Sequence, residues 1–331
     1  MSSKNKRKLQ YSLALNEALH QMMASDKSVF LIGQGVKSPW YVGNTCNGLL
    51  KKFGSKRVID TPVSENAVTG AAVGAAISGM KPIIVHPRMD FMFYAMDPII
   101  NQAANWHYMF GGKVNVPVVI WGIINRGGEQ AAQHSQTLHS FFSHIPGLKV
   151  VMPATAYDAK GLMISAIKDP NPVIYIDDRW LYKEEGIVPK EIYSVPIGKG
   201  IIRKEGKDLT IVAISYLVRE AMKAAEILKK QSIKAEVIDP RTISPLDIPL
   251  IIKSVKKTGR LLIADCGWLS GGIGADISAR ISESDAFKKL KKPIARIGLP
   301  DCPAPMSGPL EKTYYIWLED IVKAAKKLMG K

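Results

Sequence analysis

Hydrophobic and polar positions follow two different periods along the first half of the chain. Apolar residues spaced three or four apart predict amphipathic helices, and short, continuous apolar runs rich in β-branched residues predict strands buried on both faces. Helices are predicted over residues 9–24, 67–78, 97–107 and 158–167, and strands over residues 28–33, 82–85, 116–121, 148–152 and 172–176. Strands that alternate with helices in this way indicate a parallel, doubly wound sheet.

The same alternation resumes after a break. Over residues 180–194 the pattern dissolves into charged residues with Gly186 and Pro189, which marks a linker. Beyond it, strands are predicted over residues 209–214, 234–239 and 260–264, and helices over residues 218–230, 246–256, 274–282 and 317–329. A chain of 331 residues also exceeds the usual size of one domain. The sequence therefore predicts an α/β protein of two doubly wound domains, residues 1–185 and 195–331.

Composition narrows the class of protein. The chain is 47% hydrophobic and 22% charged, which is typical of a globular protein. No apolar run reaches the roughly 18 residues that span a bilayer, and the basic first eight residues precede no apolar signal core. Cys46, Cys266 and Cys302 are too widely spaced for a zinc motif and too few for a disulfide framework. We therefore expect reduced thiols in a cytoplasmic protein.

The chain is strongly basic, with a formal net charge of +16. The positive residues are scattered through lysine-rich amphipathic segments such as 220–230 and 323–331, without an aromatic-interleaved stripe or a nucleic-acid-binding motif. This distribution argues against nucleic acid as the partner. A solvated basic surface and an acidic partner subunit both remain compatible with the charge.

Two segments of the first half have residue types that suit a binding site. Glu65 directly precedes the alanine- and glycine-rich helix predicted over residues 67–78, where the helix macrodipole alone favours an acidic residue. Phe91, Phe93 and Tyr94 follow the strand predicted over residues 82–85. Ligands bind beyond the carboxyl ends of strands in α/β sheets, so these rings either stack on a planar ligand or fill the core.

Histidines and glycines supply two further candidates. His134, His139 and His144 are five residues apart, which separates helical side chains by roughly 140° and does not favour a zinc cluster. Histidine titrates near neutrality, so one of them in a loop suits proton transfer. Residues 271–274, Gly-Gly-Ile-Gly, precede a predicted helix and form either a phosphate cradle or a tight turn.

Taken together, these segments resemble the beta subunit of the pyruvate and branched-chain 2-oxo acid dehydrogenases, two-chain enzymes of the transketolase-like superfamily. The resemblance runs from about residue 8 to the C-terminus and is most specific over residues 60–65, 70–76, 132–136, 146–153, 158–161, 165–169 and 237–243. It implies a transketolase-like pyrimidine-binding domain followed by a transketolase C-terminal-like domain. It also implies a thiamine diphosphate-dependent enzyme component that decarboxylates a 2-oxo acid and passes the acyl group to a lipoyl carrier.

The resemblance assigns roles to four side chains. Glu65 matches the glutamate that hydrogen-bonds a ring nitrogen of the cofactor's aminopyrimidine and shifts it to the imino tautomer. Phe91 matches the aromatic residue that packs on this ring, and Val63 matches a residue lining the same pocket. His134 matches a loop histidine that contacts the reaction intermediate and assists acyl transfer. The electron sink belongs to the cofactor, which the protein orients and tunes.

The family also implies metal ions and partners. A potassium ion would be held largely by backbone carbonyls, at Val118, Ala166, Ile167, Asp169 and Asn171. The cofactor's diphosphate requires magnesium held by a Gly-Asp-Gly element, and the sequence contains none. An alpha-type subunit would therefore hold the magnesium, in an alpha2-beta2 heterotetramer active only with both chains. A lipoyl acyltransferase core is the further partner implied.

Two segments depart from the family pattern. Residues 86–90, His-Pro-Arg-Met-Asp, differ from the segment expected in pyruvate-type enzymes, and residues 301–307 replace the usual ending. These departures leave open a two-chain transketolase-like or acyloin-forming synthase of a specialised biosynthetic pathway. A non-catalytic binding subunit is a third alternative, against which the presence of Glu65, Phe91 and His134 argues.

Overall fold

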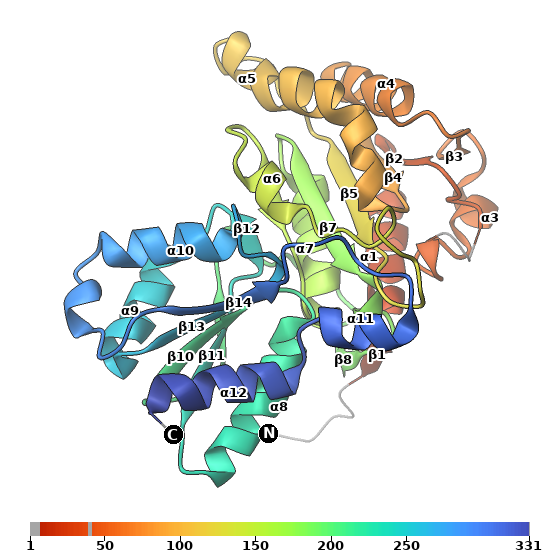
Figure 1. Cartoon of the computed structure of the whole chain (residues 1–331). Helices are drawn as coiled ribbons and strands as arrows, with labels where there is room; N and C mark the ends of the chain where they lie inside the picture. Colours follow the sequence, from red (N-terminus) through yellow and green to blue (C-terminus); the bar gives the residue numbers. More distant parts are fainter. Residues whose placement is uncertain (1–6, 39–41, 331) are drawn as a thin grey trace, which may run out of the picture. The chain divides into compact units, whose positions relative to one another are not determined.

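The computed structural model describes residues 7–38 and 42–330 (Figure 1). The chain forms two compact units, Met1–Arg126 with Gln133–Ile197 and Gly127–Ala132 with Gly198–Lys331. Each unit is a mixed α/β structure, as predicted. The short loop Gly127–Ala132 packs with the second unit although it interrupts the first in sequence, an arrangement that the hydrophobic pattern did not indicate.

Every pair of neighbouring strands within the first unit is parallel. Its strands, in the order β6-β7-β5-β4-β2-β3, are β6 (Lys149–Val151), β7 (Val173–Asp178), β5 (Val119–Ile124), β4 (Lys81–His86), β2 (Val29–Gly33) and β3 (Val58–Asp60). All residues of β2, β5 and β7 are buried. Their continuous apolar runs reflect this burial, because helices cover both faces of a doubly wound parallel sheet.

The helices predicted for the first unit are all present, but one of them is divided into two shorter helices. They are α1 (Tyr11–Ser25), α3 (Leu49–Phe53), α4 (Glu65–Ile77), η1 (Met89–Ala95), η2 (Asp97–Ala104), α5 (Asn105–Met109), α6 (His139–Ser143), α7 (Ala156–Lys168) and η3 (Arg179–Leu181). The helix predicted over residues 97–107 is a π-helix, η2, continued by the short α5. Apolar spacing does not distinguish these helix types, because both present one apolar face.

The predicted linker is fastened to the first unit rather than loose. Within it, β8 (Glu185–Ile187) pairs antiparallel with β1 (Lys8–Gln10), which aligns Lys8 with Ile187. Both strands have only three residues, too short for an alternating pattern to predict them.

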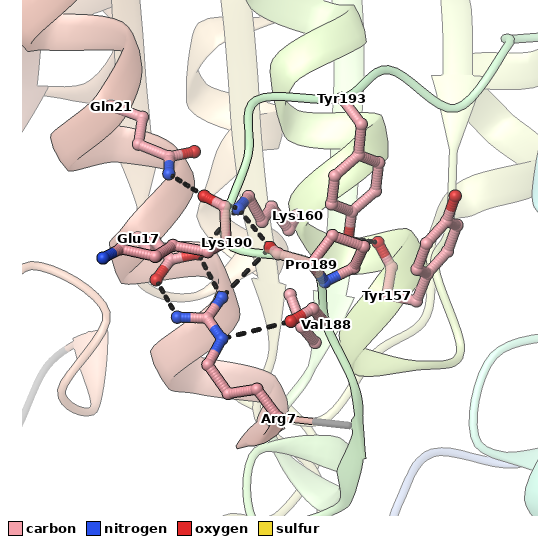
Figure 2. Close-up of polar contacts among 9 residues, drawn as sticks. All are labelled: Arg7, Glu17, Gln21, Tyr157, Lys160, Val188, Pro189, Lys190 and Tyr193. Atoms are coloured by element: carbon pink, nitrogen blue, oxygen red, sulfur yellow. Dashed lines mark hydrogen bonds and ion pairs between the residues drawn. The ribbon is translucent and has the colours of Figure 1, made fainter. Parts of the chain in front are cut away.

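Beside these strands, a fully buried lysine joins three parts of the first unit (Figure 2). Lys160 of α7 lies 2.6 Å from the Glu17 carboxylate of α1 and donates to the carbonyls of Pro189 and Lys190 at 2.8 and 3.2 Å. Arg7 pairs with the other oxygen of Glu17 at 2.7 Å and donates to the carbonyl of Pro189 at 3.0 Å. We call Arg7, Glu17, Lys160, Pro189 and Lys190 the Lys160 clamp.

The second unit has a mixed sheet in the order β14-β13-β10-β11-β9. Its strands are β9 (Ile201–Lys204), β10 (Leu209–Ala213), β11 (Ala235–Asp239), β13 (Leu261–Trp268) and β14 (Ala295–Leu299), with β12 (Thr242–Ser244) outside this order. The edge strand β9 is antiparallel to β11, whereas the other pairs are parallel. The three central strands are those that the sequence predicts.

Helices flank this second sheet on both faces. They are α8 (Leu217–Lys230), α9 (Ile248–Thr258), α10 (Ile273–Ser282), η4 (Phe287–Lys289), α11 (Gly308–Tyr314) and α12 (Leu318–Met329). In Figure 1, α8 and α12 pack together on one face, and α9 and α10 pack together on the other. In the described part of the chain, no helix combines the length and the apolar character needed to cross a membrane.

Candidate functional site

A cavity of the first unit opens where strands β2 and β4 end and helix α4 begins. It is lined by Gly33, Gln34, Thr61, Pro62, Ser64, Glu65, Val68, Ile84, Val85, His86, Pro87, Arg88 and Phe91. Ligands of doubly wound sheets bind at such carboxyl ends, because the loops that follow neighbouring strands converge there. The cavity therefore lies where the fold itself favours a ligand. We call it the ring cavity.

Glu65 is the first residue of α4, and its half-buried side chain lines the ring cavity. The unpaired amides of the first helical turn and the helix macrodipole both favour a negative charge there. One turn further, Val68 adds an apolar contact surface to the same cavity. A carboxylate thus faces a partly apolar pocket, in which a hydrogen bond to a ligand is stronger than in water.

The structure brings Phe91 and His134 together. Phe91, in η1, lines the ring cavity, and its ring packs edge-on against the imidazole of His134 with centroids 5.4 Å apart. The other two aromatic candidates do not line the cavity: Phe93 packs against Phe141, and Tyr94, whose ring centroid lies 6.4 Å from that of Phe91, is 71% exposed. Of the three rings, only Phe91 is placed to stack on a planar ligand in this cavity.

His86 is a lining residue for which the sequence analysis proposed no role. It ends β4, is 3% exposed, and places Nε2 3.2 Å from the Thr69 hydroxyl. Burial lowers the pKa of His86 to about 4, so its imidazole is neutral at pH 7. The departure of residues 86–90 from the family pattern was the available signal, because it places an unexpected polar side chain at the end of a buried strand.

Val63 does not line the ring cavity of this chain, as its predicted role requires. Its side chain is 68% exposed, and it is not among the described residues that line the ring cavity, although Pro62 and Ser64 on either side of it are. A contact between Val63 and a ligand stays a prediction. It would require a pocket that extends past the surface of this chain.

The five residues predicted to hold potassium lie where β5 begins and α7 ends. The carbonyl of Val118 accepts from the amide of Val173 at 3.0 Å, and that of Ala166 accepts from the amide of Asp169 at 3.3 Å. The ammonium of Lys149 lies 2.6 Å from the Asp169 carboxylate. Within the described chain, the buried Oδ1 of Asn171 has no hydrogen-bond partner. Oxygen donors suit potassium, but Lys149 already neutralises the one carboxylate among them.

The glycine-rich turn before α10 is closed by a side chain of the protein. The amides of Gly267 and Gly274 donate to the two carboxylate oxygens of Asp265 at 3.0 and 3.4 Å. A β-carbon at Gly272 would lie 2.2 Å from the carbonyl oxygen of Trp268. The glycine is needed for this close approach. These contacts favour the tight-turn interpretation over a phosphate cradle.

The ring cavity suits one half of a thiamine diphosphate molecule. A carboxylate at a helix start, an aromatic ring and aliphatic walls match a flat heteroaromatic ring that carries hydrogen-bonding nitrogens. A diphosphate requires cations or a helix start free to bind anions. The Gly-Asp-Gly element is absent from the sequence, and the glycine-rich turn already binds Asp265. The chain thus fits the ring, and neither of these two features offers a site for the anionic half.

Comparison with known proteins shows the family of the chain. The family model "Transketolase, pyrimidine binding domain" matches residues 7–184, and "Transketolase, C-terminal domain" matches residues 198–321. This chain belongs to the transketolase pyrimidine-binding family. Glu65, Phe91 and His134 all lie in the pyrimidine-binding domain, and the loop Gly127–Ala132 belongs to that domain in sequence while it packs with the C-terminal one.

Several relatives of this transketolase-family chain are similar over nearly its whole length. The acetoin:2,6-dichlorophenolindophenol oxidoreductase subunit beta of Cupriavidus necator is 45% identical over 333 residues and covers 98% of each chain. The pyruvate dehydrogenase E1 component subunit beta of Rickettsia bellii is 44% identical, covering 95% of this chain and 97% of its own. The mitochondrial E1 beta subunit of Pisum sativum is 43% identical, covering 95% and 88% respectively.

A solved structure supports the fold independently. The chain is similar to a split-gene transketolase in an inactive beta4 tetramer, with a TM-score of 0.79 and 22% sequence identity. The likeness covers 97% of this chain and 98% of the other. It confirms the predicted pair of transketolase-like α/β domains.

Proposed function

We propose that this chain is the beta-type subunit of a thiamine diphosphate-dependent 2-oxo acid dehydrogenase. The observation that carries the proposal is the grouping of Glu65, Phe91 and His134 around the ring cavity of a pyrimidine-binding domain. The relatives named as pyruvate dehydrogenase E1 beta subunits support this function over the synthase alternative. The cofactor would supply the electron sink for decarboxylation of the 2-oxo acid.

Each of these three residues has a separate task in this proposal. Glu65 accepts or shares a proton at a ring nitrogen of the bound cofactor and so sets its tautomer. Phe91 packs on the ring, excludes water and fixes the plane of binding. His134, which contacts the edge of Phe91, holds or donates a proton near the reacting carbon and assists transfer of the acyl group to a lipoyl carrier.

A second chain completes the site in this proposal. An alpha-type subunit would bring the magnesium and diphosphate ligands, in an alpha2-beta2 heterotetramer that docks on a lipoyl acyltransferase core. The exposed Val63 and Tyr94, near residues that line the ring cavity, are the kind of apolar surface that a partner covers. The formal charge of +16 favours an acidic partner and speeds the encounter at low salt.

A potassium ion at the end of α7 is the less developed part of the proposal. The carbonyls of Val118, Ala166 and Ile167 and the buried Oδ1 of Asn171 supply suitable oxygen donors. Since Lys149 already pairs with Asp169, the ion would be held mainly by neutral oxygens. Thermal unfolding of the purified chain tests it: potassium should raise the melting temperature more than sodium at equal ionic strength, and equal effects would contradict it.

The main proposal is tested by calorimetry with thiamine diphosphate and magnesium. The isolated chain should remain folded and bind the cofactor weakly, because the anionic half lacks its metal ligand. Addition of an alpha-type chain carrying Gly-Asp-Gly should restore tight binding. Tight, magnesium-dependent binding by the isolated chain would overturn the two-chain assignment.

Turnover by the assembled complex then separates the proposed reaction from its alternative. The complex should decarboxylate a 2-oxo acid and reduce an artificial electron acceptor or acylate a lipoyl domain. Transfer of the acyl unit to an aldehyde, with no net oxidation, would instead identify an acyloin-forming synthase.

A further inference from the structure

Within the first unit, helix α4 places a buried threonine against a histidine that lines the ring cavity. Thr69 lies four residues after Glu65, so the two side chains share one face of α4, which packs directly on β4. The fully buried Thr69 hydroxyl lies 3.2 Å from Nε2 of His86, the last residue of β4. No other described residue hydrogen-bonds either side chain. In this part of the chain, each group is thus the hydrogen-bond partner of the other.

This pairing decides which nitrogen of His86 carries the proton. Burial lowers the pKa of His86 to about 4, so the imidazole is neutral and has one N–H and one acceptor nitrogen. If Nε2 carried the proton, the Thr69 hydroxyl would accept it, and the hydrogen of that hydroxyl would be buried without an acceptor, which costs free energy. If Nε2 is the acceptor, the hydroxyl donates to it and both groups are satisfied. The contact therefore favours a proton on Nδ1.

The second nitrogen of His86 is the polar atom that this side chain can offer to a ligand. Nδ1 hydrogen-bonds no described residue, and His86 lines the ring cavity together with Glu65 and Phe91. With its proton on Nδ1, the imidazole is an uncharged donor, whereas the Glu65 carboxylate is an acceptor. A donor in a partly apolar wall is satisfied only when the ligand supplies an acceptor.

We propose that His86 is a further ligand-binding residue, which donates a hydrogen bond from Nδ1 to an acceptor nitrogen of the bound heteroaromatic ring. The inference rests on the proposed function, because an aminopyrimidine has two ring nitrogens and Glu65 engages one of them there. The other ring nitrogen is an acceptor that suits Nδ1. Thr69 is a positioning residue, since it acts through Nε2 and fixes the tautomer. A site of this kind selects a ring with an acceptor nitrogen over a ring of the same shape without one.

The first test is nitrogen NMR of the full chain at neutral pH with nitrogen-15-labelled histidine, because the shifts of the two ring nitrogens distinguish the tautomers. His86→Asn removes one set of resonances and so assigns them. The proton of His86 should be on Nδ1 in the wild type and in Thr69→Ser, which keeps the hydroxyl. Thr69→Val keeps the shape without the hydroxyl and should lose this preference. A proton on Nε2 in the wild-type chain would overturn the proposal.

The second test is calorimetry of the assembled two-chain complex with thiamine diphosphate and magnesium. His86→Leu removes the donor and should weaken binding by about 10- to 100-fold. His86→Asn, whose amide lies near the position of Nδ1, should recover most of this loss, whereas His86→Gln, whose amide lies near that of Nε2, should not. His107→Leu, which removes a half-buried imidazole bonded to the carbonyl of Val114, is the control. Wild-type affinity in a folded His86→Leu complex would refute the contact.

A pyridine analogue of the cofactor separates a direct contact from a change in the shape of the cavity. In this analogue, C–H replaces the ring nitrogen that Glu65 does not engage. The wild-type complex should bind the analogue about 10- to 100-fold more weakly than thiamine diphosphate, and His86→Leu should bind both about equally, because the donor is gone. Equal discrimination by the two complexes would show that His86 does not contact this nitrogen.

The NMR measurement keeps this inference separate from the proposed function. If the complex binds no thiamine diphosphate, the proposed function fails, and the tautomer alone then decides whether His86 presents an N–H donor in the ring cavity. A complex that binds the cofactor while Nε2 of His86 carries the proton would refute the inference and leave the proposed function standing.

Discussion

The Lys160 clamp and the ring cavity lie in the same unit and use similar residue types in opposite ways. In the clamp, the ammonium of Lys160 is enclosed by the Glu17 carboxylate and the carbonyls of Pro189 and Lys190 (Figure 2). In the ring cavity, Glu65 is half-buried and no hydrogen bond joins its side chain to another described residue. One region has satisfied its polar groups and the other presents them to a ligand.

This difference shows how a charge is used for stability or for chemistry. Burial opposes ionisation of Glu17, but hydrogen bonds from Arg7 and Lys160 outweigh it and lower the Glu17 pKa. A charge held so closely has no capacity left for a ligand. Glu65 is held by its helix start instead, which leaves its carboxylate oxygens available. Substitutions in the two regions should therefore change different measured quantities.

The largest effect is expected at Glu65. Glu65→Gln keeps the size of the side chain and should leave the melting temperature of the chain unchanged, because Glu65 forms no ion pair within the described structure. An amide cannot share a proton as a carboxylate does, so kcat of the assembled enzyme should fall by about 10,000-fold, the upper end for acid-base groups. Steady-state kinetics of the complex tests this, with Glu283→Gln as the control. Turnover near that of the wild type would remove Glu65 from the mechanism.

Lys160→Met should have the opposite effect to Glu65→Gln: it should lower stability and leave turnover nearly unchanged. Methionine keeps the apolar stem, but the half-buried Glu17 carboxylate and two backbone carbonyls lose a donor. Removing one member of a buried ion pair costs about 3–5 kcal/mol, and we expect about 3 kcal/mol because Arg7 still pairs with Glu17. Denaturant unfolding measures this loss, while kcat per folded complex should stay within about twofold of the wild type.

Lys81→Met is the matched control for the Lys160 clamp. Lys81 pairs with Asp26 at 2.9 Å, but their side chains are 36% and 31% exposed. Partly exposed pairs of this kind contribute about 0–1 kcal/mol. Equal losses of stability from Lys81→Met and Lys160→Met would mean that burial does not strengthen the clamp.

A smaller effect on turnover is expected at His134. His134→Ala should lower kcat by about 100-fold, the lower end for acid-base groups, and leave the affinity for thiamine diphosphate unchanged. The histidine packs against the edge of Phe91 rather than lining the ring cavity itself, so the ring should still bind. Calorimetry and single-turnover kinetics of the complex separate the two quantities. Lost stability with unchanged turnover would favour a structural role for the imidazole.

The sequence predicted the central strands and helices better than it predicted the contacts that connect them. Buried strands such as β5 and β10 are continuous apolar runs, so their pattern was sufficient. The three-residue strands β1 and β8 are too short for a period, and their pairing depends on contacts between residues far apart in sequence. The Lys160 clamp was hidden for the same reason.

Within the site, resemblance placed Glu65, Phe91 and His134, and the structure brings the last two into contact. His86 was missed because its placement involves a contact with the hydroxyl of Thr69, 17 residues earlier in the sequence. The hydrogen bonds of Glu129 with Gly308 and Glu311 were equally hidden, since they join residues about 180 apart in sequence. Polar contacts between distant segments leave no periodic signal, whereas buried apolar faces do.

The smallest predicted effect concerns Asp177, a carboxyl that is buried like the clamp but, among the described residues, forms no ion pair. Burial raises the pKa of Asp177 to about 7, although the neighbouring polar groups of Trp121 and Tyr182 partly oppose the shift. The folded state therefore binds a proton that the unfolded chain, with a pKa of 3.8, has released. The resulting stability is present at low pH and is lost as pH rises from about 4 to about 7.

The contribution of His86 to stability changes with pH in the opposite direction over the same range. Its folded pKa of about 4 lies below the unfolded value of 6.5, so the unfolded chain binds the extra proton and stability rises with pH over this interval. The two slopes oppose each other in the wild type, so a flat stability profile would not reveal either. Comparison with Asp177→Asn removes the contribution of His86, because both proteins retain that residue.

Asp177→Asn should consequently change the pH dependence of stability rather than its level at one pH. Between pH 5 and pH 7, the free energy of unfolding of the variant should rise by about 2 kcal/mol relative to the wild type, from about 1.4 kcal/mol per unit of pH. Glu17 and Asp26 have lowered pKa values and titrate below this window, so they contribute little to the difference. Denaturant unfolding at pH 5, 6 and 7 measures it. Parallel profiles for the two proteins would show that Asp177 ionises as easily in the folded chain as in the unfolded chain. The difference between Asp177 and the Lys160 clamp could then not be attributed to burial without a cation.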